Sequence, residues 1–360
     1  DIYSTAQNVS VNISGGEVVS TADSVLGVRG NEKIVVNITG GTLTSIGRTG
    51  VFISSSTTPS PIQFTMTGGT LNHSSGMSGA IQASKGSVIT IGGTAKINSE
   101  SSYAIQVQEN TVVNVEGGTL SSGSGSAAIS AEGTSSVSIS NGSISSVRGS
   151  AIKAEETANI TISGGSVSGG SNRDAVEKKD LTANVTVVGG SFSSDIADFT
   201  GEGTTVAKHT TTNGQSTYYA GTPENVANTL SSVVQSSDTV EITKGNANLT
   251  LPAGTEVTNS GGGAVLANEQ QIGSDPIAAP ALVTFVVING TWEGEGTTEK
   301  KVSVALTSGH GTLAEGDIPI PVADPGHTGG SWDVTPVTTA NGITANVTYT
   351  YTFDPQTPAP

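Results

Sequence analysis

A segment of about 24 residues that recurs eight times is the feature that most constrains how this chain folds. Each copy carries an apolar–polar–apolar triplet before a corner that is usually glycine-rich, as in VNITGG and VNVEGG. The first apolar position holds Val11, Val36, Phe64, Ile89, Val113, Val137, Ile160 and Val185; the second holds Ile13, Ile38, Met66, Ile91, Val115, Ile139, Ile162 and Val187. This period-two alternation is typical of a strand with one buried face.

Two further apolar columns follow within each repeat. The column after the corner contains Val18, Leu43, Leu71, Ile97, Leu120, Ile144, Val167 and Phe192, and the last column contains Leu26, Phe52, Ile81, Ile105, Ile129, Ile152 and Val176. Each repeat therefore holds three short strands and three bends. A unit this short cannot bury its apolar side chains alone, but stacked copies share a continuous core. The sequence predicts an all-β fold, a parallel β-helix of about eight rungs, within residues 1–199.

The glycine pairs mark the bend between the first and second strands. Glycine adopts positive φ without steric cost, so it suits a sharp turn that must stay in register with its neighbours. A phosphate-binding glycine loop would need a following helix and a Lys-Ser/Thr pair, and these corners have neither. We interpret the glycines as turn residues.

Residues 10–195 resemble the pectin-lyase-like right-handed β-helix. The resemblance is carried by the VNITGGTLTS and SGAIQA types of segment, and it is closest to repeat versions found in large bacterial surface proteins. It implies a right-handed coil. It does not imply one activity, because this fold occurs in lyases, hydrolases, adhesins and tailspikes.

The remaining residues predict a small α+β cap over 200–275. Asn213-Gly214 lies between two β-rich runs and indicates a hairpin. Residues 222–235 have helical spacing of Val226, Leu230 and Val233 or Val234, with Pro223 at the start, and so predict one helix. Such a cap would cover the open strand edges at the end of the coil.

A linker over 276–281 precedes a third region over 282–354. Its NGTW, GSWDVTP and TYTYTF segments resemble the B-repeat modules of internalin-type bacterial surface proteins. The resemblance implies a small β-grasp-like module that serves as a spacer or an adhesive domain. Residues 355–360 have the composition of a Pro/Thr linker.

The charge of the chain excludes some partners. The formal net charge is −16, from 30 acidic and 14 basic residues, so we expect no nucleic-acid partner. No run of 18 apolar residues is present, and we expect no direct membrane insertion. The absence of cysteine excludes disulfides and thiolate sites.

One group of acidic residues raises the question of a metal site. The repeat alignment places Glu109, Glu132 and Glu155 near one another on stacked rungs, where a Ca²⁺ ion would relieve their repulsion. The alternative is a solvated charged edge that Lys179 partly neutralises. In either case we expect no catalytic residue, because none of the four histidines neighbours another in the repeat alignment. We therefore expect a non-enzymatic protein with no cofactor other than a structural Ca²⁺.

A polar column faces outward between the two apolar positions of the first strand. It consists of Asn12, Asn37, Thr65, Thr90, Asn114, Ser138, Thr161 and Thr186. We expect an extracellular protein of a bacterial cell surface, a structural or adhesive β-helix that contacts a host or bacterial glycan or a surface protein. The alternatives are a filament subunit that joins sister subunits end to end, and a calcium-dependent polysaccharide lyase or hydrolase. The first strand begins close to Asp1 without a cap, so we expect preceding residues or a partner at that end.

Overall fold

The computed structural model describes residues 2–4, 8–55, 62–74 and 78–356. The chain is all-β, with 51% strand and 5% helix, and it divides into two compact units. The first unit comprises residues 1–204 with 217–222, and the second comprises 205–216 with 223–360. Residues 357–360 of the predicted Pro/Thr linker lie outside the described residues.

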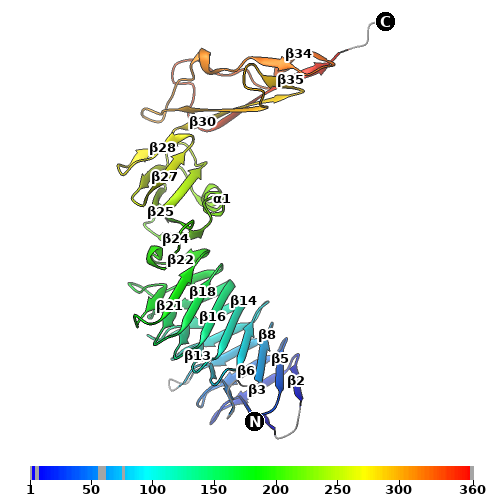
Figure 1. Ribbon diagram of the computed structural model, residues 1–360, viewed down its shortest axis with the longest axis vertical. Helices are drawn as coiled ribbons and strands as arrows, with labels where there is room; N and C mark the ends of the chain where they lie inside the picture. Colours follow the sequence, from blue (N-terminus) through cyan, green and yellow to red (C-terminus); the bar gives the residue numbers. More distant parts are fainter. Residues whose placement is uncertain (1, 5–7, 56–61, 75–77, 357–360) are drawn as a thin grey trace. The chain divides into compact units, whose positions relative to one another are not determined.

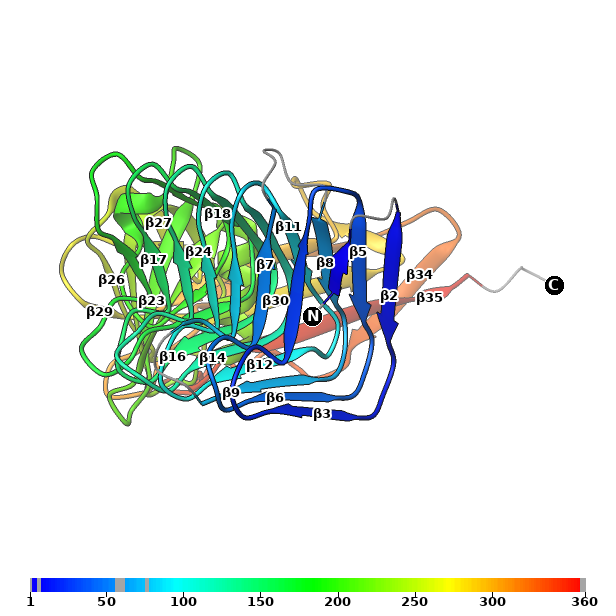
Figure 2. The ribbon, with the colours of Figure 1, turned by 90° about the horizontal axis from the view of Figure 1, so that it is seen from below.

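The first unit is a parallel β-solenoid of about seven turns (Figure 1). Its first sheet stacks β2 (Val9–Ile13), β5 (Ile34–Ile38), β8 (Ile62–Met66), β11 (Val88–Ile91), the starts of β14 (Val112–Ser122) and β16 (Ser136–Ser146), β18 (Asn159–Ile162) and β21 (Asn184–Val187). Its second stacks β3 (Glu17–Ser20), β6 (Thr42–Ser45), β9 (Thr70–His73), β12 (Lys96–Ser99), the ends of β14 and β16, β19 (Ser166–Ser168) and β22 (Gly190–Phe192). Its third stacks β1 (Ile2–Ser4), β4 (Leu26–Gly30), β7 (Val51–Ser54), β10 (Ile81–Ala83), β13 (Ile105–Val107), β15 (Ile129–Ala131), β17 (Ile152–Ala154) and β20 (Val176–Lys178). Figure 2 looks along the coil from its N-terminal side and shows the chain running clockwise as it recedes, so the coil is right-handed.

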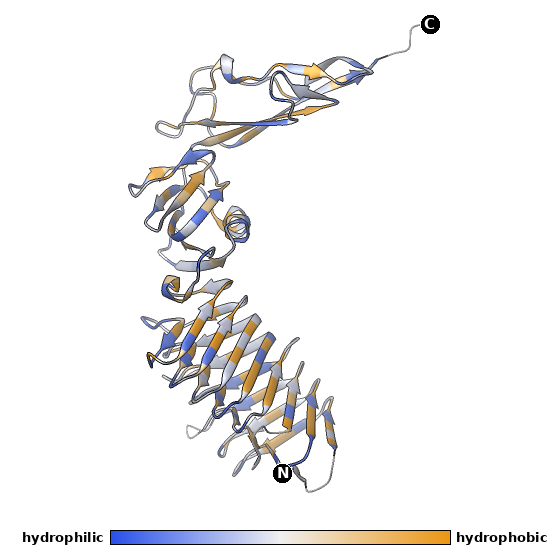
Figure 3. Cartoon of the chain, viewed as in Figure 1, coloured by the Kyte–Doolittle hydropathy of each residue, from blue (hydrophilic) through white to orange (hydrophobic). Residues whose placement is uncertain are grey.

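The inward columns of the first two strands are confirmed from the second turn onward, whereas in the first turn Val18 is exposed and Val11 and Ile13 are only partly buried. Val36 pairs with Phe64 and Phe64 with Ile89, and all three side chains are at most 1% exposed. Figure 3 shows apolar residues alternating with polar ones along these strands. Because each turn places an apolar residue above an apolar residue, the columns form the continuous core that the repeat predicts.

The third column needs one correction. In turn two the residue that pairs with Leu26 and Ile81 is Val51, which is fully buried, whereas the prediction assigned Phe52. Phe52 instead points outward, and the Arg29 guanidinium lies 4.9 Å from the centre of its ring. The assignment was wrong by one residue because Val51, Phe52 and Ile53 are all apolar, so period two cannot choose between them.

A buried polar column ends the second sheet, which the sequence did not reveal. It consists of Ser45, His73, Ser99, Ser122 and Ser146, all at most 5% exposed. These side chains bond to backbone groups of the bend in their own turn or in the preceding one: the Ser122 hydroxyl donates to Ser126 O at 3.0 Å, and His73 Nε2 donates to Arg48 O of the preceding turn at 2.6 Å. They satisfy backbone groups of the bend that would otherwise be buried without a partner.

The corner between the first and second sheets explains why glycines occur in pairs. Gly69 has φ of 79°, which favours glycine, as the sequence predicts. The first glycine of the pair has a different role: a Cβ at Gly68 would collide with the carbonyl oxygen of Thr39 in the preceding turn. Gly69 therefore permits the turn, and both glycines permit the close stacking of two turns, since a Cβ at Gly69 would lie 2.7 Å from Gly41 O.

An antiparallel strand closes the C-terminal end of the second sheet. Strand β24 (Ser216–Gly221) pairs with β22 through Gly190–Ala220, Ser191–Tyr219 and Phe192–Tyr218. A 3₁₀ turn, η1 (Ala197–Phe199), follows the last solenoid strand, and Thr200 forms a parallel bridge with Val187. The edges of these strands are thus covered within the unit, as a cap requires.

The second unit begins with the predicted helix and its strands. Helix α1 (Pro223–Val233) buries Val226 and Leu230, and Val234 is buried beyond its end. Strand β25 (Thr239–Leu249) pairs with β23 (Thr205–Thr210), β26 (Glu256–Asn259) and β27 (Gly262–Ala267); β28 (Gln270–Gln271) and β29 (Ile277–Ala278) complete this region. The turn at Asn213-Gly214 lies between β23 and β24, as predicted.

The C-terminal region is a four-stranded sheet in the order β32 (Glu299–Val304), β30 (Ala281–Ile288), β35 (Val347–Pro355), β34 (His327–Trp332). The central pair β30–β35 is parallel and the outer pairs are antiparallel, which is compatible with the predicted β-grasp-like module. A ribbon of β31 (Gly290–Trp292) and β33 (Pro321–Ala323) and the 3₁₀ turn η2 (Glu315–Asp317) complete it. Phe285, Trp292 and Tyr349 form its buried aromatic core, with Phe285 and Tyr349 stacked at 5.8 Å.

We predict that Gly68→Ala and Gly69→Ala each destabilise the first unit by about 1–3 kcal/mol, the first through collision with Thr39 and the second through backbone strain and collision with Gly41. Gly125→Ala is the matched control, because its Cβ would meet nothing within 4 Å, and it should change stability by less than about 0.5 kcal/mol. Thermal unfolding followed by circular dichroism measures the difference. If Gly68→Ala behaves like Gly125→Ala, the close approach of the turns does not limit the residue at position 68.

Candidate functional site

The predicted outward polar column lies on the first sheet in unbroken register. Its members Asn12, Asn37, Thr65, Thr90, Asn114, Ser138, Thr161 and Thr186 pair with one another from turn to turn. At its start the Asn37 amide nitrogen donates to Asn12 Oδ1 at 2.9 Å. A similar ladder on the second sheet, which was not predicted, joins Asn98 to Asn72 and Ser121 to Asn98 at 3.0 and 3.1 Å. These two ladders display short, uncharged side chains that partly satisfy each other.

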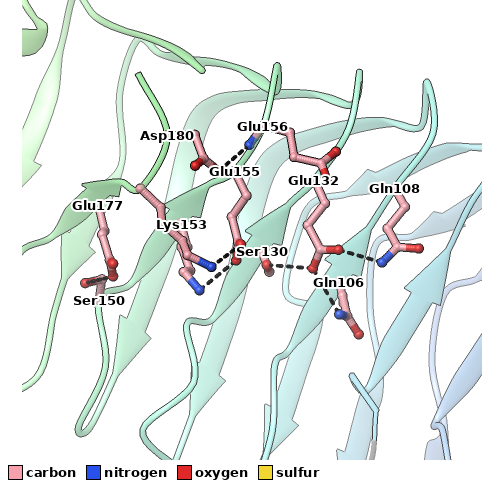
Figure 4. A network of polar contacts seen from close by, with 11 residues as sticks. Gln106, Gln108, Ser130, Glu132, Ser150, Lys153, Glu155, Glu156, Glu177 and Asp180 are labelled. Carbon is pink, nitrogen blue, oxygen red and sulfur yellow. Dashed lines mark hydrogen bonds and ion pairs between the residues drawn. The ribbon is translucent and has the colours of Figure 1, made fainter. Parts of the chain in front are cut away.

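The third sheet carries longer and charged side chains, which we call the polar strip. Its outward strand position holds Gln82, Gln106, Ser130, Lys153 and Glu177, and the first position of the following bend holds Gln108, Glu132, Glu155 and Lys179. Figure 4 shows the strip from Gln106 to Glu177, with these side chains lying side by side along the sheet. The residue after each Ala-Ile pair in the sequence marks the first of these columns, so inspection of that position could have found it.

Glu132 occupies the middle of the polar strip and takes its donors from neutral groups. Gln106 Nε2 and Gln108 Nε2 donate to its two carboxylate oxygens at 3.1 and 2.6 Å, and the Ser130 hydroxyl lies at 3.4 Å. Ser130 is fully buried, although it occupies an outward position. These bonds hold the Glu132 carboxylate in one orientation.

Glu155, one turn further along, is neutralised by two lysines. Lys153 Nζ lies 2.6 Å from one of its oxygens and Lys179 Nζ lies 2.8 Å from the other. Burial opposes ionisation of Glu155, but the hydrogen bonds from Lys153 and Lys179 outweigh it, so the pKa of Glu155 is lowered. The neutralising role that the sequence suggested for Lys179 is confirmed.

The structure does not align all three glutamates of the predicted calcium site. Glu132 and Glu155 share a column, but Gln108 takes the corresponding position one turn earlier; Glu109 lies one residue further into the bend, with φ of 51°, beside Gly133. Gly133 in turn lies near Glu156, so Glu109 belongs to a separate, exposed position of the bend. Within the described residues, no group of three or more His, Asp and Glu side chains is arranged to hold a metal ion.

The polar strip has features of a recognition surface, and its Glu155 does not have those of a general acid. A general acid needs a raised pKa, whereas the pKa of Glu155 is lowered by its two lysines. The strip instead offers fixed carboxylate and amide oxygens on a rigid sheet. Such an arrangement can accept hydrogen bonds from a ligand without reorganising.

The fold places the chain in a structural class, the parallel β-solenoid repeat proteins. Comparison with protein-family models, with curated proteins and with solved structures finds no match in any of the three. No helix among the described residues is long and apolar enough to cross a membrane. The pectin-lyase-like and B-repeat resemblances therefore stay predictions.

We predict that the Glu155 ion pairs contribute to stability only where the carboxylate is ionised. Because the pKa of Glu155 is lowered in the folded protein, the contribution is complete above its ordinary value of 4.5 and is lost as the pH falls through the folded pKa. Urea unfolding at pH 7 should show Glu155→Gln to be less stable than wild type by about 0.5 kcal/mol. The difference should vanish at pH 2, and a constant difference at both pH values would contradict this account.

Proposed function

We propose that this chain is an extracellular protein of a bacterial cell surface, in which the β-solenoid acts as a structural and adhesive scaffold. The observation that carries the proposal is the turn-to-turn register of outward polar side chains, which is unbroken on the first sheet and runs from Gln82 to Glu177 on the third. A ligand that lies along a sheet meets the same kind of side chain on each turn. Many weak contacts then add up without any one deep pocket.

The rigidity of the solenoid supports this role. Its core columns are apolar and mostly at most 1% exposed, and the buried serines fix the bends. A scaffold with this packing presents its faces in one conformation, so little entropy is lost when a surface binds. We further propose that the repeats are of the pectin-lyase-like type and that residues 282–354 are a B-repeat-like spacer.

The two alternative functions lack comparable support. A filament built by end-to-end strand pairing would use the outer edge of β22, but β24 already occupies that edge. A calcium-dependent lyase or hydrolase would need convergent carboxylates, whereas Glu132 and Glu155 are held by amides and lysines. Structural adhesion needs neither feature.

Adhesion can be tested with beads that carry the purified chain. We expect the beads to be retained on at least one of mucin, host-cell matrix protein or bacterial wall polysaccharide, and not on albumin. Two matched triple variants report whether the first or the second sheet makes the contact. One changes Thr65, Thr90 and Asn114 of the first sheet to Ala, and the other changes Asn72, Asn98 and Ser121 of the second sheet to Ala. Retention on none of the surfaces would contradict the proposal. So would new unsaturated or reducing ends in a polysaccharide incubated with the chain and Ca²⁺.

A further inference from the structure

One bend position before the third sheet places its side chain against the polar strip of the next turn. Two members of this position show that geometry: Thr49 Oγ1 lies 3.4 Å from Gln82 Oε1, and Ser150 Oγ lies 3.0 Å from Glu177 Oε2. The backbone of a third member, Gly79, is placed alike, since a Cβ there would lie 3.3 Å from Gln106 Cβ. Each of them is three residues before the outward residue of its own turn. A side chain at this position therefore covers the outward residue of the following turn.

Tyr103 occupies this position in the turn of Gln106. The residue that it should cover is Ser130, which is fully buried despite lying at an outward position. Tyr103 itself is half-buried. Since Ser130 contacts Glu132, a Tyr103 side chain that covers Ser130 would lie near the Glu132 carboxylate.

The amide groups around Glu132 direct their oxygen atoms away from it. Gln106 and Gln108 direct their amide nitrogens at Glu132, and Figure 4 shows their carbonyl oxygens pointing away from it. Gly79, which precedes this turn, has no side chain that could cover Gln106. The patch thus combines two fixed amide oxygens, one carboxylate and one aromatic face.

We propose that Tyr103, Gln106, Gln108 and Glu132 form a binding subsite for a neutral sugar ring of a glycan. The apolar face of the ring would stack on Tyr103, while its hydroxyl groups donate to the oxygens of Gln106, Gln108 and Glu132. A carboxylated sugar would be repelled by Glu132, whose donors are all neutral. This inference rests on the adhesive function proposed above and assigns its ligand to the third sheet.

The test measures binding of the full chain to immobilised β-glucan, galactan, mannan and poly-N-acetylglucosamine, with polygalacturonate as the acidic comparison. Calorimetric titration with an oligosaccharide of the best-bound polymer then gives Kd. We expect Tyr103→Ala and Glu132→Gln each to raise Kd about tenfold. The matched controls are Phe52→Ala, an outward aromatic on the same sheet, and Glu155→Gln, the lysine-paired carboxylate; both should leave Kd unchanged.

Gln106→Ala and Gln108→Ala keep the test valid if Tyr103→Ala does not fold, because both truncate surface side chains and should also raise Kd. The inference is overturned if these variants bind as wild type does, if only polygalacturonate binds, or if a CaCl₂ titration gives heat that Glu132→Gln abolishes. Bead retention that persists in Tyr103→Ala overturns this subsite but leaves adhesion intact. Loss of all bead retention by wild type overturns both.

Discussion

Parallel pairing of successive turns is the interaction on which the rest of the first unit depends. Strands in a sheet lie about 4.8 Å apart, so every turn must offer the same backbone path and the same kind of side chain at each position. This requirement produces the apolar columns, such as Val36 below Phe64 and Phe64 below Ile89. It also produces the outward ladders, because polar residues are stacked by the same register.

Close stacking of the turns crowds the backbone at the bends and buries its polar groups, and particular residues at the bends compensate for both effects. At the first corner, Gly68 lets the carbonyl of Thr39 approach and Gly69 supplies the positive φ. At the second bend, the buried serine column and His73 accept or donate hydrogen bonds that the backbone of the bend cannot make with water. Strand stacking and the residues at the bends therefore depend on each other, because each turn limits which residues its neighbour can carry.

The polar strip shows how the same register creates a candidate binding surface. Lys153 and Lys179 lie on successive turns and both reach Glu155, while Gln106 and Gln108 share one turn and both reach Glu132. Neighbouring turns thus supply partners that one repeat could not provide alone. The result is one neutralised carboxylate and one carboxylate held only by neutral donors, on the same rigid sheet.

The sequence by itself determined the repeat, the three strands of each turn, the first two apolar columns, the outward Asn/Thr/Ser ladder and the helix of the cap, because strict periodicity and turn residues encode them. Only the tertiary structure decided whether Val51 or Phe52 enters the core column, and whether Gln108 or Glu109 shares the column of Glu132. In the first case three adjacent residues are apolar, and in the second two adjacent polar residues both lie in the bend, so the sequence pattern fits either register. Backbone hydrogen bonds to the turns on both sides fix one register of each strand and bend. That choice turns Phe52 to the surface and sets Gln108 beside Glu132.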